Sequence, residues 1–168
     1  MQRADQAQAP AITGGAIRQF LTFQLADAEY GLDILKVREI RVWEPATPLP
    51  NTPVFVKGVI NLRGSVVPII DLRERLGLPA QPYGPRTVVI VVNLGQGDQA
   101  KVVGMVVDAV CDEHSLNEAL IRPPPDLGGP IERSFVVGLA EVPGRMIVLL
   151  DSDRLLELAL GEGMAATA

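Results

Sequence analysis

The residues best suited to chemistry are Cys111 and His114, the only cysteine and the only histidine of the chain. With the acidic residues on either side of them, they could bind a metal ion, but zinc sites normally draw on more cysteine and histidine ligands. A hydrolytic role would place His114 between a nucleophile and a carboxylate, and its neighbour Ser115 gives no such geometry by itself. We therefore expect a structural cysteine and a solvated histidine, with no catalytic or metal site.

A second candidate is the segment GQGDQA at residues 95–100, which matches the dinucleotide-binding pattern GxGxxA in form. That chemistry needs a helix directly after the glycines, because the helix N-terminus holds the pyrophosphate. The sequence that follows, KVVGMVVDAV, is rich in β-branched residues and predicts a strand instead. We expect a hairpin turn here and no cofactor.

Composition narrows the class of protein. The chain has 168 residues, among them 16 Gly and 14 Pro, a content of helix breakers that favours a sheet protein. Its longest aliphatic runs, at 88–92 and 146–150, fall far short of the roughly 18 residues of a membrane span. A net charge of −5 disfavours nucleic acid as a partner, and the opening residues lack the apolar stretch of a secretory signal. We expect a cytoplasmic protein.

The pattern along the chain is one of short strands and tight turns. Residues 1–16 are polar and aperiodic and predict a flexible tail, and a second tail is expected at 161–168. A helical turn is expected at 36–41. The segment VKGVINLRGSVVPII predicts a hairpin that turns at Arg63-Gly64, and Asp71 then has the spacing of a capping residue for a short helix.

An internal repeat is the strongest feature of the sequence. VVGLAEVPGRMIVLLDSDRLL aligns with VKGVINLRGSVVPIIDLRERL at a constant offset of 80 residues, through glycines, turn and leucines. We infer two similar halves, about 17–78 and 86–160, each with about five strands and a terminal helix, joined by a turn-rich linker at 79–86. Strands this short are typical of small barrels that bury their open faces against each other.

Without an evident active site, the chain is expected to work through a recognition surface. Arg63 is either a solvated charge or a residue displayed to a partner. Gly58 lies within a strand pattern and indicates a bulge or a close approach of another backbone. Val37 and Val110 are equivalent in the repeat and are core residues or groove anchors. Glu39 could pair with Arg63 and orient it.

Three segments then make a resemblance clear: FLTFQLADAEYGLDILKVREIR, NTPVFVKGVINLRGSVVPIIDLR and VVGMVVDAV with the later IRPPP. Together they closely resemble the CheW family of chemotaxis coupling proteins, from about residue 18 to residue 160. The resemblance implies an all-β fold with short helices, in which two SH3-like five-stranded β-barrel subdomains surround a shared hydrophobic core.

The resemblance also implies a function. The chain would be a non-enzymatic adaptor that couples the cytoplasmic hairpin tips of chemoreceptors to the regulatory domain of the histidine kinase CheA, and would meet the membrane only through receptor arrays. In the family, a groove between the barrels receives the receptor helix. The matching positions are Val37, Glu39, Gly58, Arg63, Val103, Gly104 and Val110.

Two further functions compete with this one. Cys111 and His114 could serve a small-molecule-binding or hydrolytic β-barrel. A nucleic-acid-binding barrel is weakened by the negative charge and by the shortage of aromatic residues on which bases could stack. The chain also departs from the family pattern at Glu113 and His114, where an aliphatic residue is common, so partner choice near the second half is open.

Overall fold

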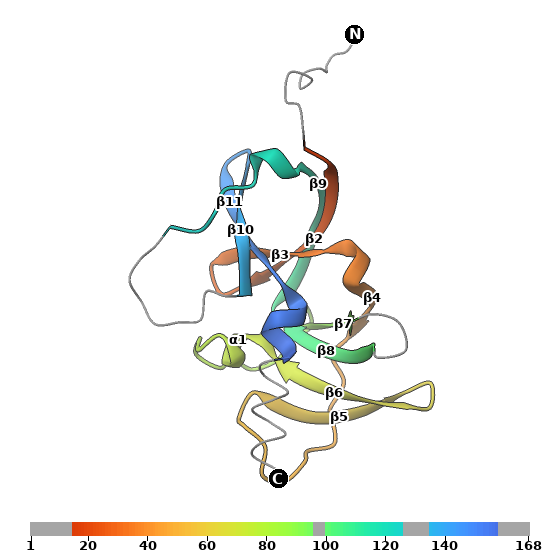
Figure 1. Ribbon diagram of the computed structural model, residues 1–168. Helices are drawn as coiled ribbons and strands as arrows, with labels where there is room; N and C mark the ends of the chain where they lie inside the picture. Colours follow the sequence, from red (N-terminus) through yellow and green to blue (C-terminus); the bar gives the residue numbers. More distant parts are fainter. Residues whose placement is uncertain (1–14, 96–99, 126–134, 158–168) are drawn as a thin grey trace.

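Ten strands in two five-stranded sheets make up the fold (Figure 1). The computed structural model describes residues 15–95, 100–125 and 135–157. The first sheet has the order β10-β11-β3-β2-β9 and the second the order β4-β7-β8-β6-β5. In chain order the strands are β2 (Ile17–Leu25), β3 (Ala28–Asp33), β4 (Val37–Val42), β5 (Val56–Leu62), β6 (Ser65–Asp71), β7 (Val88–Leu94), β8 (Lys101–Val107), β9 (Ala109–Asn117), β10 (Val136–Val142) and β11 (Arg145–Leu150).

Short helical segments connect the strands. They are the 3-10 turns η1 (Ile34–Lys36) and η3 (Glu118–Leu120), the helix α1 (Leu72–Arg75), and a helical segment at residues 152–157. Figure 1 shows the first sheet above the second, with the helical segment that follows β11 between them. Leu155 and Leu156 of this segment are fully buried in the cluster that the two sheets share. The predicted all-β fold with short helices is confirmed.

The apolar residues form three clusters because both faces of most strands are covered. The largest cluster lies between the sheets and includes Phe23 and Leu32 of the first sheet and Ile90 and Met105 of the second. Each sheet also encloses a smaller cluster on its other face, with Phe20 in one and Val91, Ile69 and Val67 in the other. The predicted shared core is therefore present, with a separate interior for each sheet.

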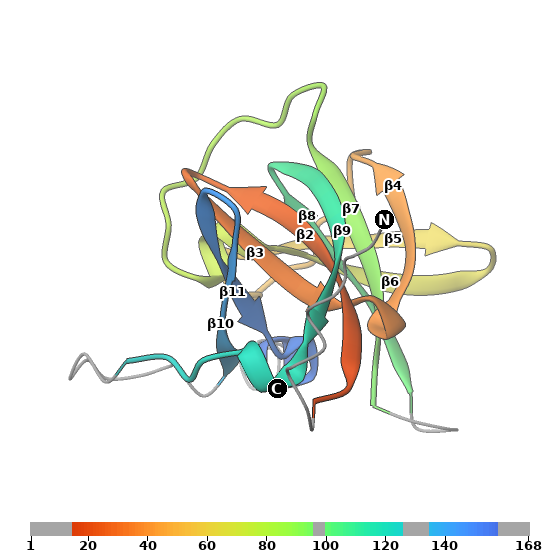
Figure 2. The same cartoon turned by 90° about the horizontal axis from the view of Figure 1, so that it is seen from above.

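The two sheets do not coincide with the two halves of the sequence. The hairpin β2–β3 belongs to the front half, about 17–78, yet it forms a sheet with β9, β10 and β11 of the rear half. Strands β7 and β8 of the rear half, about 86–160, in turn complete the sheet of β4, β5 and β6. The halves are joined by the parallel pairs β11–β3 and β6–β8 and by the antiparallel pairs β2–β9 and β4–β7. Figure 2, seen from above, shows the hairpin β2–β3 among the strands of the rear half.

The repeat itself holds down to single hydrogen bonds. Asp71 N donates to Phe55 O at 2.8 Å, and 80 residues later Asp151 N donates to Phe135 O at 2.8 Å. Residues 58 and 138 are both buried glycines in which a Cβ would clash with the carbonyl oxygen of a crossing segment. The Asp71 carboxylate accepts from Glu74 N at 3.1 Å, which confirms the predicted cap.

Two local predictions have different outcomes. The helical turn expected at 36–41 is wrong: the 3-10 turn ends at Lys36, and β4 begins at Val37. Alternating β-branched residues in VREIRV pair with β7, and this pairing prevails over the weak helical pattern. The hairpin expected in place of a cofactor site is confirmed, since β7 and β8 pair antiparallel up to Leu94 and Lys101. Residues 96–99 and most of both predicted tails lie outside the described residues.

Candidate partner-binding site

The predicted pairing of Glu39 with Arg63 is present. Arg63 lies at the turn of the β5–β6 hairpin with φ +52, and its Nη2 forms an ion pair with Glu39 Oε2 on β4. Strands β4 and β5 are the two edges of the second sheet, so this contact joins its ends. Arg41 Nη1 lies 3.5 Å from Glu39 Oε1 and helps to hold the carboxylate. The Arg63 side chain is 65% exposed, so it remains available to a partner.

Strand register explains how the predicted residues relate in space. Glu39 pairs with Val91, Val91 with Gly104, Gly104 with Ile69, and Ile69 with Gly58. Three predicted site residues therefore stand in one row across all five strands of the second sheet. The row ends at β4 on one side and at β5 on the other, close to where the ion pair closes the sheet.

Gly58 and Gly104 allow close packing within this sheet. A Cβ on Gly58 would lie 2.0 Å from Thr47 O, where a crossing segment pairs with β5. A Cβ on Gly104 would lie 2.7 Å from Ile69 Cδ1 and 2.8 Å from Val89 Cγ1. Both glycines are buried and permit close packing beneath the surface, and their predicted part in partner binding stays a prediction.

The three predicted valines differ in burial. Val103 is fully buried between the sheets, and its predicted part in partner binding stays a prediction. Val37 on β4 and Val110 on β9 are partly buried and pack against the shared cluster from the two sheets. They can offer apolar surface at its margin while remaining anchored to the core.

A small pocket lies beside Arg63 at the end of the second sheet. It has a volume of about 70 Å³ and is lined by Arg38, Leu62, Arg63, Ser65, Val67 and Val102. Apolar side chains stand exposed nearby on the same sheet, namely Ile40 and Val42 on β4 and Val66 on β6. Sequence reasoning missed these residues. The signal for them was the alternation Ile40-Arg41-Val42 in β4, which places Ile40 and Val42 on the face opposite Glu39.

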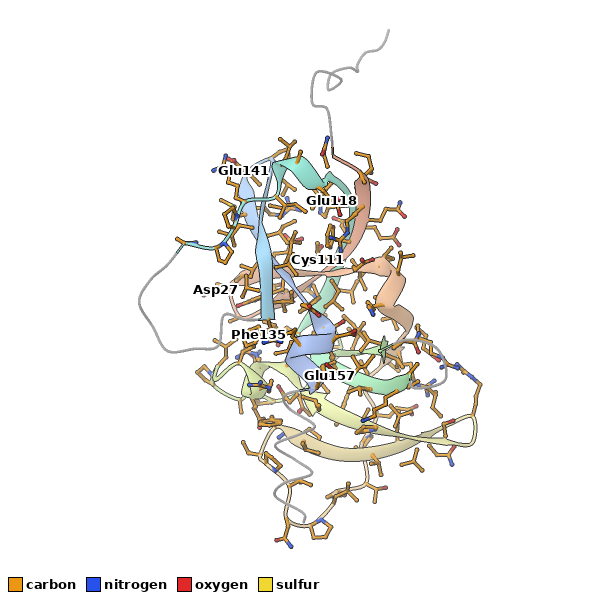
Figure 3. All side chains as sticks on the ribbon, viewed as in Figure 1. Asp27, Cys111, Glu118, Phe135, Glu141 and Glu157 are labelled. Carbon is orange, nitrogen blue, oxygen red and sulfur yellow. The ribbon has the colours of Figure 1, made fainter. Side chains whose placement is uncertain are left out.

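The alternative based on Cys111 and His114 finds little support in their surroundings. Cys111 lies on β9 near the middle of the molecule (Figure 3) and is exposed. Burial of its thiol and the charges of Glu29 and Asp112 raise the pKa of Cys111, which disfavours the nucleophilic thiolate. Among the described residues, no three His, Cys, Asp or Glu side chains form a group that could hold a metal ion.

Within residues 15–95, 100–125 and 135–157, no helix has the length and apolar character needed to cross a bilayer.

Comparison with known proteins connects this geometry to a family. Residues 19–160 match the model of the CheW-like domain. The chain is 46% identical over 151 residues to the chemotaxis protein CheW of Klebsiella aerogenes, covering 88% of this chain and 89% of the relative. It is 44% identical over 142 residues to the chemotaxis protein CheW of Rhizobium meliloti, covering 84% of this chain and 88% of the relative.

A solved structure agrees with the sequence matches. The crystal structure of the scaffolding protein TtCheW from Thermoanaerobacter tengcongensis superposes with a TM-score of 0.74 at 35% sequence identity. The superposition covers 84% of this chain and 94% of the other. The similarity therefore extends over both sheets.

Proposed function

We propose that this chain, which belongs to the CheW family of chemotaxis scaffold proteins, couples the cytoplasmic tips of chemoreceptors to the histidine kinase CheA. The family is one of scaffolds, not of enzymes. In this proposal the chain works in the cytoplasm beneath receptor arrays and meets the membrane only through the receptors. It needs no cofactor and no nucleic acid.

The observation that carries the proposal is the exposed Arg63 guanidinium, held by Glu39 on β4, a strand whose opposite face carries the exposed apolar side chains Ile40 and Val42. An amphipathic helix docks when apolar side chains on one of its faces find an apolar surface. Ile40, Val42 and Val66 offer such a surface, and Val37 connects it to the core. A charge fixed at the rim then sets the register of the helix, because displacement would leave its own charged partner unpaired.

The kinase would dock elsewhere on the chain. By the family resemblance, its regulatory domain has a fold similar to this one, so two related barrels would meet. The first sheet ends in the β10–β11 hairpin, where Met146 is exposed directly after the turn, so this end of the chain offers the kinase an apolar residue separate from Val66.

The test is reconstitution of receptor-dependent kinase activity with the purified chain. The wild-type protein should raise CheA autophosphorylation in the presence of receptor, and Arg63→Asp should lose most of this effect. Its melting temperature should change little, because an exposed ion pair contributes only about 0–1 kcal/mol. Arg154→Asp, which changes an exposed arginine of the helical segment at 152–157, should keep full coupling.

A charge-swapped variant distinguishes a role of Arg63 in partner binding from a role of the ion pair in shaping the sheet. In Glu39→Arg/Arg63→Glu the ion pair is restored with reversed polarity, so the link between β4 and the β5–β6 turn should return, while coupling should stay low because the partner meets the wrong charge. Full coupling by the swapped variant would mean that the pair only shapes the sheet. Unchanged kinase activity on addition of the wild-type chain would overturn the proposal as a whole.

A further inference from the structure

Three charged or titratable side chains from different strands meet at one end of the first sheet. Glu29 lies on β3, His114 on β9 and Arg145 at the start of β11. Arg145 Nε donates to Glu29 Oε1 at 2.5 Å. Arg145 Nη2 lies 3.4 Å from His114 Nε2, and the same imidazole nitrogen lies 3.9 Å from Glu29 Oε2.

This cluster leaves one polar atom without a partner. Glu29 is only 12% exposed, and its Oε2 is buried with no hydrogen bond from the residues that the structure describes. A buried carboxylate oxygen without a donor is unfavourable. His114 Nε2 lies 3.9 Å from this oxygen, and it can donate only when it carries a proton.

The protonation state of His114 decides which contacts are possible. With Nε2 unprotonated, the nitrogen accepts a hydrogen bond from Arg145 Nη2, and Glu29 Oε2 stays unpaired. With Nε2 protonated in the imidazolium, it can no longer accept. It then repels the guanidinium and donates to Glu29 Oε2, which satisfies the orphaned oxygen.

The other groups around the imidazole do not alter this change of contact from Arg145 to Glu29. On β2, Phe20 pairs with His114, and the guanidinium of Arg18 lies 5.0 Å from the centre of the Phe20 ring. Also on β2, Thr22 Oγ1 exchanges hydrogen bonds with the backbone of Asp112. Asp112, Glu113 and Cys111 are exposed neighbours on β9 itself. Glu29 and Arg145 are the charged groups within 4 Å of the ring nitrogen among the contacts described.

We propose that His114 is a proton-operated latch, which contacts Arg145 beside the turn of the β10–β11 hairpin when neutral and gives up this contact for Glu29 when protonated, while Arg145 keeps its bond to Glu29 Oε1. A histidine exchanges its proton within the range of about pH 5 to 8, so the latch would respond to acidification of the cell. The turn that it controls, Pro143-Gly144, borders a groove that Leu120 and Arg122 also line. Acidification would therefore alter one wall of that groove.

The second sheet has no such latch. The repeat offsets of 73 and 80 place Val102, Arg41 and Ser65 where the first sheet has Glu29, His114 and Arg145. The turn of the β5–β6 hairpin should then be insensitive to pH over the same range. The turn of the β5–β6 hairpin is therefore an internal control for the turn of the β10–β11 hairpin. This comparison does not depend on whether the chain couples receptors.

The test is nuclear magnetic resonance of the full chain between pH 8.5 and 5. The ring signals of the single histidine report its protonation directly. The amide signals of Gly144 and Arg145 should move with the same midpoint as the His114 ring, while that of Gly64 should not. In His114→Gln, which cannot take up a proton, the movement of Gly144 and Arg145 should be lost.

A second variant leaves His114 able to take up a proton but removes the carboxylate that the imidazolium would contact. In Glu29→Gln, the His114 ring should still titrate, but the shifts of Gly144 and Arg145 should shrink to less than half, because no carboxylate draws the imidazolium away from Arg145. The proposal fails if His114 titrates in the wild-type chain while Gly144 and Arg145 stay fixed. It also fails if their movement persists in His114→Gln.

Discussion

The hydroxyl of Tyr83 donates a 2.5 Å hydrogen bond to Asp71 Oδ2, which ties the segment between the two halves of the chain to the cap of α1. Asp71 is almost fully buried and uses its other oxygen to cap the helix, so the carboxylate has a donor on each side. The Tyr83 ring also packs against Trp43 at a centroid distance of 4.3 Å. The predicted linker at 79–86 is thus fixed by specific contacts.

Tyr83→Phe should destabilise the protein by about 1–3 kcal/mol, because it removes a hydrogen bond to a buried carboxylate and keeps the ring that packs on Trp43. Burial and the Asp71 carboxylate raise the pKa of Tyr83, so the phenol remains a donor well into the alkaline range. A group whose pKa is raised on folding stabilises the protein below its unfolded value, near 10, and loses this effect above it. Urea unfolding at pH 7 measures the difference.

Tyr30→Phe is the matched control for this change. Tyr30 stacks on Phe23 at 6.0 Å, and its hydroxyl forms no hydrogen bond with the described residues. Its loss should change the free energy of unfolding by less than about 0.5 kcal/mol. Equal effects of the two changes would show that the Tyr83–Asp71 bond contributes nothing.

Gly58→Ala should cost about 3 kcal/mol or more. Gly58 has φ +133, a conformation that L-residues rarely adopt, and an added methyl group would lie 2.0 Å from Thr47 O. Thermal unfolding should show a fall of several degrees. Gly84→Ala is the control: nothing lies within 4 Å of its Cβ position, and the change should alter stability by no more than about 0.5 kcal/mol. Wild-type stability of Gly58→Ala would contradict the close approach of the two backbones.

The repeat could be read from the sequence because glycines, a capping Asp and leucines recur at one offset, and each has a local structural cause. The pairing of Glu39 with Arg63 could also be predicted, since both residues belong to the same half. The exposure of individual residues to solvent could not be predicted from the sequence. Strand periodicity tells which residues share a face, but where both faces are apolar it does not tell which face water reaches. The resemblance placed Val103 in the groove, and nothing in the pattern of its strand indicated that this side chain is fully buried.

The exchange of strands between the halves also could not be predicted from the sequence. Two equivalent copies of a sequence unit have the same pairing preferences, so the sequence alone does not tell whether β2–β3 joins its own copy or the other one. The choice depends on the path of the segment at 79–86 and on the length of the connections, which are properties of the whole chain.

Glu29→Gln should destabilise the chain by about 1–2 kcal/mol at pH 7. Burial works against ionisation of Glu29, but the Thr22 hydroxyl and the Arg145 guanidinium prevail and lower its pKa below the usual 4.5. A carboxyl group with a lowered pKa stabilises the folded state above its unfolded value, and the effect is lost as the pH falls through the folded value. The difference between wild type and variant should therefore shrink below about pH 4.

The control for this pH dependence is Glu141→Gln. Glu141 pairs with Arg122 at 3.4 Å, but both side chains are exposed, so the pair is screened by water. Its removal should change stability by less than about 0.5 kcal/mol at any pH between 3 and 8. A wild-type advantage over Glu29→Gln that stays constant down to pH 3 would rule out a charged Glu29 as its source.

Cleavage within residues 79–86 should leave a folded complex of two fragments, neither of which folds alone. The front fragment would carry β2–β3 without β9, β10 and β11, and the rear fragment would carry β7–β8 without the rest of the second sheet. An isolated two-stranded hairpin is marginally stable at best, so each fragment lacks the partners that bury its apolar faces. Together they restore both sheets and the shared cluster.

We expect a protease site placed at Gln81 to yield fragments that elute as one species from gel filtration and separate only in denaturant. Each purified fragment should show no cooperative unfolding, and a mixture of the two should regain it. Cooperative unfolding of either fragment by itself would mean that the halves fold independently and that the exchange of strands is not required for stability.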